Sequence, residues 1–226
     1  MEQLQNGYTL DIPAGCFPLS TDSMLLSDFV HIPKNARILD LGSGCGTLGL
    51  LLCAKDSGCS LTGIEIDGVA HAAALENIAR NGLSDRMTSL HGDLRQTHGK
   101  VFDLCISNPP YYSGGPASLS TPTARRDDHC SMEALFATAS RCTKFGGDFC
   151  LVHKPENLAR LCYLAVENGL EPKRLRLVHH KEGGPVSLVL LSCRKGGKPG
   201  LVTDEVILFH QNNQPTDYYK SVYHLP

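Results

Sequence analysis

The sequence ARILDLGSGCG at residues 36–46 is the most informative part of this chain for its fold class. Residues 36–41 form a short apolar run typical of a buried strand. Closely spaced glycines follow it, and residues 47–56 then have helical length and apolarity. Such glycines let the backbone approach a ligand, and the amino terminus of the following helix favours negative charge. The sequence therefore predicts a ligand-binding turn between a first strand and its helix.

Strands and helices alternate outward from this turn. Further apolar strands are expected at residues 60–67, 87–93, 102–107 and 148–154, with helices at 68–82, 131–147 and 156–169. Two closing strands near residues 175–181 and 186–193 have only the four residues EGGP between them, so they should pair antiparallel. The pattern predicts a doubly wound, mostly parallel seven-stranded α/β sheet with one antiparallel strand in the C-terminal hairpin.

The length and composition suit one domain. The chain has 226 residues and 42% hydrophobic content, enough for a buried α/β core. We expect an N-terminal extension at residues 1–35, with a helix capped by Thr21 or Asp22, then the domain at 36–200 and a tail at 201–226. No apolar run approaches the ~18 residues of a membrane span, and the N-terminus has no leader pattern, so a cytoplasmic protein is expected. The ten cysteines include no C-x-x-C pair, so no metal is expected.

Polar residues at the ends of three successive strands indicate a nucleotide cofactor. The third glycine of the turn comes one residue too early for G-x-G-x-x-G and fits the D-x-G-x-G-x-G form that receives S-adenosylmethionine. Glu65 can take both ribose hydroxyls, and Asp93 can accept from the adenine amine. Alone, the glycines would make only a tight turn and the acids would be ordinary strand ends; their conjunction favours binding. The expected cofactor residues are Asp40, Gly42, Ser43, Gly44, Gly46, Glu65, Ile66, Asp93, Leu94 and Asn108.

The strand at 102–107 ends on Asn108-Pro109-Pro110-Tyr111. Two prolines cannot continue a sheet, so backbone carbonyls, the Asn108 amide oxygen and the Tyr111 ring are left close together. That set suits a planar amino group, which donates two hydrogen bonds and stacks on a ring. A plain strand terminator is the structural alternative. The motif resembles the catalytic motif of amino-group methyltransferases, so Asn108, Pro109, Pro110 and Tyr111 are the expected catalytic residues.

The chain as a whole resembles the tRNA adenine-N6 methyltransferases that act on the adenosine next to the anticodon of valine tRNA. The resemblance extends from about Pro18 to Leu201 and lies in LSTDSMLLSDF, LDLGSGCGTLGL, GIEID, ALENIARNGL, FDLCISNPPYY, ARRDDH, LEPKRLRLVH and SCRKGGKPGL. It implies a class I methyltransferase domain at 36–200 that uses S-adenosylmethionine and releases S-adenosylhomocysteine. It also implies a tRNA partner. From the sequence features above we expect no metal and no membrane, and we expect a monomer.

Three other functions remain open on the residues alone. A guanine-N2 rRNA methyltransferase would hold its amine with the same oxygens. Glutamine-N5 protein methyltransferases share Asn-Pro-Pro-Tyr, but they resemble chains with a longer helical N-terminal domain than residues 1–35. A module that binds S-adenosylmethionine without turnover would not need the intact motif.

Net charge gives mixed support for an RNA substrate. The 21 Lys and Arg against 23 Asp and Glu give −2, which is poor for a nucleic-acid binder. Residues 172–198, however, carry seven Lys or Arg against one Glu, a local balance of +6. A solvated hairpin surface is the alternative to an RNA contact. The RNA-binding candidates are Arg125, Arg126, Lys173, Arg174, Lys195 and Lys198.

Overall fold

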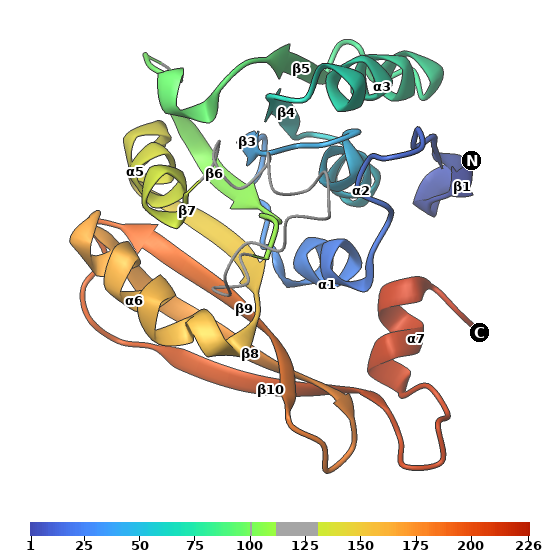
Figure 1. Cartoon of the computed structure of the whole chain (residues 1–226), viewed down its shortest axis with the longest axis vertical. Helices are drawn as coiled ribbons and strands as arrows, with labels where there is room; N and C mark the ends of the chain where they lie inside the picture. The colour runs from blue at the N-terminus through green and yellow to red at the C-terminus, as the bar shows by residue number, and fades with distance from the viewer. Residues whose placement is uncertain (100, 112–130) are drawn as a thin grey trace, which may run out of the picture.

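The computed structural model describes residues 1–99, 101–111 and 131–226 (Figure 1). Within these residues, the main sheet has eight strands in the order β10-β8-β9-β7-β6-β3-β4-β5. Neighbouring strands pair parallel except at β9, which is antiparallel to both β7 and β8. The strands are β3 (Arg37–Leu41), β4 (Ser60–Glu65), β5 (Met87–His91), β6 (Phe102–Ser107), β7 (Thr143–His153), β8 (Leu170–Lys181), β9 (Val186–Lys195) and β10 (Val202–Phe209).

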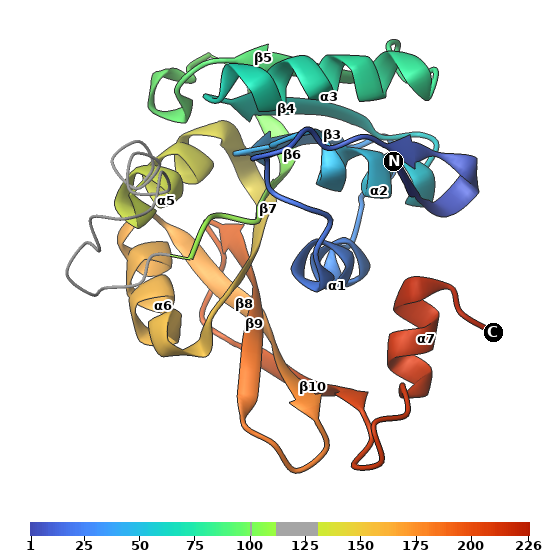
Figure 2. The same cartoon turned by 45° about the vertical axis from the view of Figure 1, so that its right-hand side comes forward.

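Helices cover both faces of this sheet. One face carries α1 (Thr21–Phe29) and α2 (Thr47–Lys55), and the other carries α5 (Met132–Cys142) and α6 (Leu158–Glu167) (Figure 2). The remaining elements are α3 (Gly68–Arg80), α7 (Asp217–Tyr223), the 3-10 turns η1 (Gln5–Gly7), η2 (Leu94–Gln96) and η3 (Pro155–Asn157), and a small hairpin of β1 (Glu2–Gln3) and β2 (Thr9–Leu10). None of the helices described is long and apolar enough to cross a bilayer.

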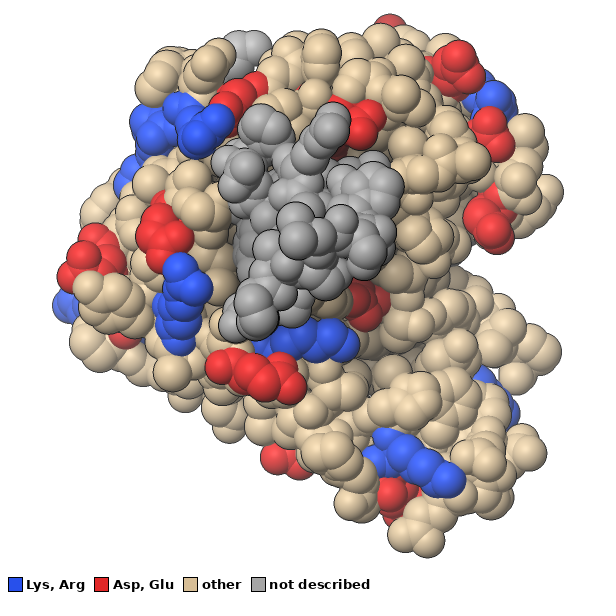
Figure 3. Space-filling model, viewed as in Figure 1, with Lys and Arg blue, Asp and Glu red and all other residues tan. Residues whose placement is uncertain are grey.

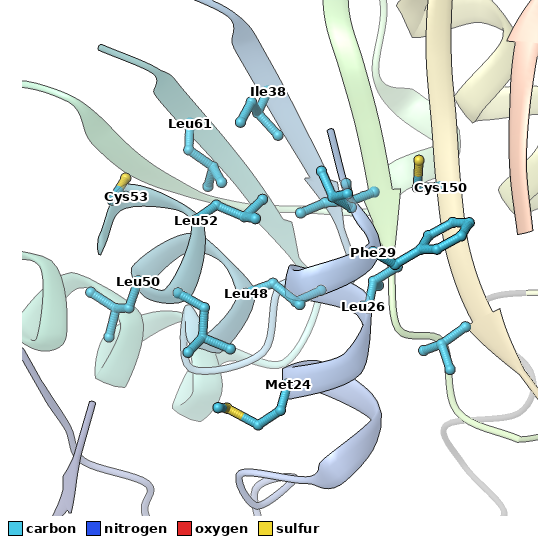
Figure 4. Close-up of a cluster of buried hydrophobic side chains, with 14 of the residues drawn as sticks. Met24, Leu26, Phe29, Ile38, Leu48, Leu50, Leu52, Cys53, Leu61 and Cys150 are labelled. Carbon is cyan, nitrogen blue, oxygen red and sulfur yellow. The ribbon is translucent and has the colours of Figure 1, made fainter. Parts of the chain in front are cut away.

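Successive residues of a strand pack into two separate apolar layers, one on each face of the sheet. On β3, Ile38 packs with α1 and α2, whereas Leu39 packs with α5 and α6 on the other face. Figure 4 shows the first layer, in which leucines of α2 meet the inner side of α1 and the strands beneath. Full burial of each such leucine contributes roughly 1.5–3 kcal/mol, so the two layers fix how α1 and the strand ends lie relative to one another.

The predicted fold class is confirmed, including the single antiparallel strand, but the sheet has eight strands where seven were expected. The additional strand is β10, which pairs parallel with β8 and falls in the segment expected as a tail. Its first half, Val202–Glu205, is mostly polar and exposed because β10 is an edge strand, and Leu208 is its one fully buried residue. The apolar residues of this strand are confined to positions 206–209, so the segment did not show the pattern of a full-length strand. The domain boundaries at 35 and 200 remain a prediction.

Two local boundaries also differ from those expected. Ser20, not Thr21 or Asp22, caps α1, and its hydroxyl accepts from the backbone N–H of Ser23. The helix α5 ends at Cys142, and β7 begins directly at Thr143. Capping by Ser20 leaves the side chains of Asp22 and Ser23 available for contacts elsewhere.

Parallel strands direct their carboxyl ends to one edge of the sheet. At that edge, β3 leads into the glycine turn, β4 ends at Glu65, and β6 runs into Asn108. The strand β7 ends there at His153. The chain therefore collects the predicted cofactor and motif residues at one side of the molecule.

Candidate active site

The glycine turn is held open by backbone geometry and by one carboxylate. Gly42, Gly44 and Gly46 have φ of 77°, 54° and 84°, a region that favours glycine. One oxygen of Glu65 accepts from the N–H of Gly44 at 2.7 Å, and the other accepts from the N–H of Asp67 at 2.8 Å. Because each carboxylate oxygen has two lone pairs, both retain capacity for a ligand hydroxyl. Glu65 thus ties the turn to the end of β4.

Asp40 is a buried carboxylate beneath the turn. It is 1% exposed, and among the described residues neither of its oxygens has a hydrogen-bond partner. Burial, and secondarily the charge of Glu65, raises the pKa of Asp40 to about 8. The hydroxyl of Ser43 is likewise buried without a partner in the described chain. A ligand that brings an ammonium and hydroxyl donors, as S-adenosylmethionine does, would fit these acceptors.

Gly63 on β4 explains how Ser43 reaches its place. A Cβ built on Gly63 would lie 2.5 Å from the Ser43 hydroxyl oxygen. Any other residue would therefore displace Ser43 and the turn that carries it. The position of the glycine turn therefore depends on the absence of a side chain at Gly63.

Asp40→Asn should change the pH dependence of stability. The folded protein holds a proton on Asp40 that the unfolded chain releases between its ordinary pKa of 3.8 and about 8. This group therefore lowers stability progressively as pH rises through that window and by a constant amount above it. Asparagine cannot ionise, so the variant should gain stability relative to wild type between pH 4 and pH 8. Denaturant unfolding at several pH values measures this, and a gap that is the same at pH 4 and pH 8 would contradict it.

The other predicted cofactor residues occupy the neighbouring strand ends. Ile66 is 43% exposed, an apolar side chain that a bound ring could cover. Asp93 caps η2 and forms an ion pair with Arg95. Leu94 is buried in the layer of α5 and α6, where its carbonyl accepts from Thr138. Contacts of Ile66, Asp93 and Leu94 with an adenine ring remain predictions.

Asn108 is oriented by a residue far away in the sequence. Its side-chain Nδ2 donates to the hydroxyl of Ser23 in α1 at 3.0 Å, so its Oδ1 lies at the opposite end of the amide. Ser107 fixes the strand end before it, donating to the carbonyl of Leu41 at 2.7 Å. Pro109 is buried and Pro110 is exposed. The strand end therefore presents an oriented amide beside the glycine turn.

Tyr111 is half-buried and anchored at its hydroxyl. The hydroxyl donates to Asp22 of α1. Burial, and then the hydrogen bond and charge of Asp22, raises the pKa of Tyr111 well above its usual range, so the phenol stays protonated. Lys154 lies over the ring with its Nζ 5.0 Å from the centroid, and His153 packs edge-on at 5.2 Å. The ammonium of Lys154 therefore already covers part of the ring expected to stack on a base.

Three residues at this site were not identified from the sequence as functional: Asp22, Ser23 and His153. Asp22 and Ser23 were interpreted only as part of a helix start. His153 is fully buried, its Nδ1 accepts from the N–H of Lys154, and its Nε2 has no partner among the described residues. Burial chiefly lowers the pKa of His153, which keeps the ring neutral with its proton on Nε2. The only available signal for His153 was its place at the end of a buried strand.

The RNA-binding candidates do not share one surface with Asn108. The end of β6 is level with Leu175 of β8, two residues after Lys173. Lys173 is therefore separated from Asn108 mainly across the sheet, by three strand spacings or about 14 Å. Lys173 donates to the carbonyl of Lys198, which follows β9. Arg174 faces α1, where it bonds Phe29 and pairs with Asp204, whereas Lys195 faces α5 on the other side of the sheet.

Charge on the visible face is mixed. In Figure 3, basic side chains of the described residues lie in separate groups beside acidic ones. Arg125 and Arg126 lie outside the described residues. Within the residues the structure describes, no group of three or more His, Cys, Asp or Glu could hold a metal ion.

Comparisons with known proteins identify the family of this chain. The model of the methyltransferase small domain family matches residues 19–161. A Bacteroides fragilis protein named tRNA1(Val) (adenine(37)-N6)-methyltransferase is 34% identical over 77% of this chain and 76% of its own length. A protein of that name from Dickeya chrysanthemi is 32% identical over 80% of this chain and 74% of its own length.

Solved structures share the fold. A predicted O-methyltransferase from Agrobacterium tumefaciens superposes with a TM-score of 0.74 at 20% identity, covering 90% of this chain and 96% of that chain. A ribosomal protein L11 methylase from Lactobacillus delbrueckii superposes with a TM-score of 0.57 at 17% identity, covering 77% of each chain. At these identities the likeness concerns the fold alone.

Proposed function

The chain belongs to the methyltransferase small domain family, and its relatives include proteins named tRNA1(Val) (adenine(37)-N6)-methyltransferase. On this basis we propose that it methylates the N6 amine of an adenine in tRNA. In this proposal the methyl donor is S-adenosylmethionine. The proposed target is the adenosine at position 37 of a valine tRNA, which is the target that the names of the relatives give for those proteins. The observation that carries the proposal is the place of Asn108-Pro109-Pro110-Tyr111, at the end of β6 and next to the glycine turn after β3.

The residues around the turn would hold the cofactor. Bound there, S-adenosylmethionine supplies an electrophilic methyl group on a sulfonium. Glu65 would accept the ribose hydroxyls while it keeps the turn in place through Gly44. Asp40 and Ser43 would face the amino-acid end, where their buried oxygens need donors. Because the glycines have no side chains, the protein backbone of the turn can approach the ligand closely.

The motif would make the target amine reactive by orientation. An adenine N6 amine is a poor nucleophile because its lone pair is delocalised into the ring. If Oδ1 of Asn108 and the carbonyl of Pro109 accept its two N–H bonds, the nitrogen is held with its lone pair free for in-line attack. These oxygens also stabilise the positive charge that develops on nitrogen, by a few kcal/mol in a site of this kind. No strong base is then required.

The alternatives fit the chain less well. Guanine N2 would use the same oxygens, and glutamine N5 would as well, but the curated relatives reported above carry neither name. Nucleoside analysis of tRNA and rRNA from cells with and without this protein tests the choice. Loss of N6-methyladenosine from one tRNA supports the proposal; loss of an N2-methylguanosine from rRNA instead would replace it.

We also propose that Lys173 and Lys198 contact tRNA phosphates away from the target base. A Lys173→Ala/Lys198→Ala variant should bind full tRNA more weakly, with a shallower salt dependence, because each lost phosphate contact removes about one counterion-release term. A short single-stranded RNA with the target adenine should bind as before, since β8, which carries Lys173, lies three strand spacings, about 14 Å, across the sheet from β6. Lys173→Arg/Lys198→Arg is the charge-preserving control. Unchanged tRNA affinity at several salt concentrations would leave these lysines as solvated surface.

A further inference from the structure

The first turn of α1 contacts the side chains of the first and last residues of the Asn-Pro-Pro-Tyr motif. Ser23 accepts from Nδ2 of Asn108 at 3.0 Å, and the adjacent Asp22 accepts from the hydroxyl of Tyr111. These contacts join positions 85 and 89 residues apart in the chain. Two neighbouring residues of one helix therefore hold the two ends of a four-residue motif.

The contact with Ser23 decides which end of the Asn108 amide faces the target. An asparagine amide carries an acceptor oxygen and a donor nitrogen at nearly equivalent positions, so rotation about its last bond exchanges them. Ser23 is 3% exposed, and its hydroxyl oxygen accepts a hydrogen bond from the amide nitrogen of Asn108. The exchanged orientation would present N–H groups to an amine that itself must donate. Only one orientation leaves Oδ1 to accept from the target.

The structure also explains why Ser23 itself is fixed. The hydroxyl of Ser20 accepts the N–H of Ser23 and lies 3.4 Å from the Ser23 hydroxyl oxygen, so Ser20 can receive the Ser23 proton while Ser23 receives the amide. At the same turn, Tyr223 of α7 donates to the hydroxyl of Thr21 at 2.8 Å. The start of α1 is thus held by its own cap and by the C-terminal helix.

We infer that Ser23 is a positioning residue, which acts on methyl transfer through Asn108 by keeping the amide oxygen toward the target amine. The inference rests on the proposed function, because it assigns Ser23 a part in that reaction. On this inference Ser23 acts only through Asn108 and contacts neither the cofactor nor the target. Its effect should therefore appear in kcat and not in the binding of S-adenosylmethionine or in KM for tRNA.

Ser23→Ala should lower the single-turnover rate of methyl transfer to tRNA about tenfold, the scale for losing one oriented hydrogen bond to a buried group. Ser23→Thr keeps the hydroxyl and should restore most of the rate. Ser27→Ala is the matched control: Ser27 is also buried on α1, but its hydroxyl donates to the carbonyl of Met24 and not to the motif. That control should retain the wild-type rate, and thermal unfolding should show Ser23→Ala and Ser27→Ala to be similarly folded.

A double-mutant cycle separates positioning from general support of the fold. In an Asn108→Ala background, Ser23→Ala should cause no further loss, because the amide through which Ser23 acts is gone. A wild-type rate for Ser23→Ala, or the same tenfold loss in both backgrounds, would overturn the inference while leaving the proposed function intact. No methyl transfer by the wild-type chain would overturn both.

Discussion

Asn108→Ala is expected to reduce methyl transfer to tRNA by ~10²-fold or more, the usual cost of removing one preorganised polar partner of a developing charge. The substitution removes the oxygen oriented by Ser23 and leaves the strand end anchored by Ser107 and Leu41. Binding of S-adenosylmethionine should change far less, because the glycine turn and Glu65 do not depend on Asn108. Single-turnover assays with tRNA and calorimetric titration of the cofactor measure the two effects separately.

Conservative changes in the motif provide the controls. Asn108→Asp keeps an acceptor oxygen and adds negative charge beside the developing cation, so measurable activity should remain. Tyr111→Phe retains the ring and should be milder than Tyr111→Ala, although it removes the hydroxyl that donates to Asp22. A wild-type rate for Asn108→Ala would mean that the motif only terminates β6, and the reaction would have to be assigned from the cofactor site alone.

Glu65→Ala should weaken the binding of S-adenosylmethionine by ~1–3 kcal/mol, the range for losing charge-assisted hydrogen bonds. The structure adds a second reason, because Glu65 also holds the N–H of Gly44 and so shapes the turn before any ligand arrives. Glu65→Gln keeps one acceptor oxygen and should lose less. Calorimetric titration gives the affinities.

The matched control for Glu65 is Glu76→Ala, since Glu76 is an exposed acid on α3 that lies outside the turn. That variant should bind the cofactor as wild type does. Equal affinities for Glu65→Ala and wild type would show that Glu65 does not bind the cofactor. Its role would then be limited to the hydrogen bonds that it accepts from Gly44 and Asp67.

The sequence was most informative where local chemistry and topology coincide. Glycine spacing, apolar strands and the terminating prolines predicted the parallel sheet and the edge at which the site lies, because each follows from backbone geometry. The family resemblance stated from the motifs is confirmed by the match to residues 19–161 and by the relatives at 34% and 32% identity. The roles of the individual site residues stay predictions.

The parts that the sequence did not predict depend on distant partners. The contact of Ser23 with Asn108 spans 85 residues, and no periodicity in α1 signals it. The first half of the edge strand β10 is mostly polar and exposed and only its second half is apolar, so the segment was expected to be a tail. The local charge of +6 at residues 172–198 was counted without ion-pair partners from outside that segment. In the structure, Asp204 pairs with Arg174 and Asp148 pairs with Arg194. Charge alone therefore overstated the free positive surface of this hairpin.

Transfer of a methyl group to the N6 amine of adenine in tRNA can be observed directly. The most direct measurement incubates the purified protein with valine tRNA and methyl-labelled S-adenosylmethionine, digests the RNA and identifies the labelled nucleoside by mass spectrometry. We expect label in N6-methyladenosine with the wild-type chain, and at least ~10²-fold less with Asn108→Ala. Label in N2-methylguanosine, or no label in tRNA under conditions in which the cofactor binds, would contradict this expectation.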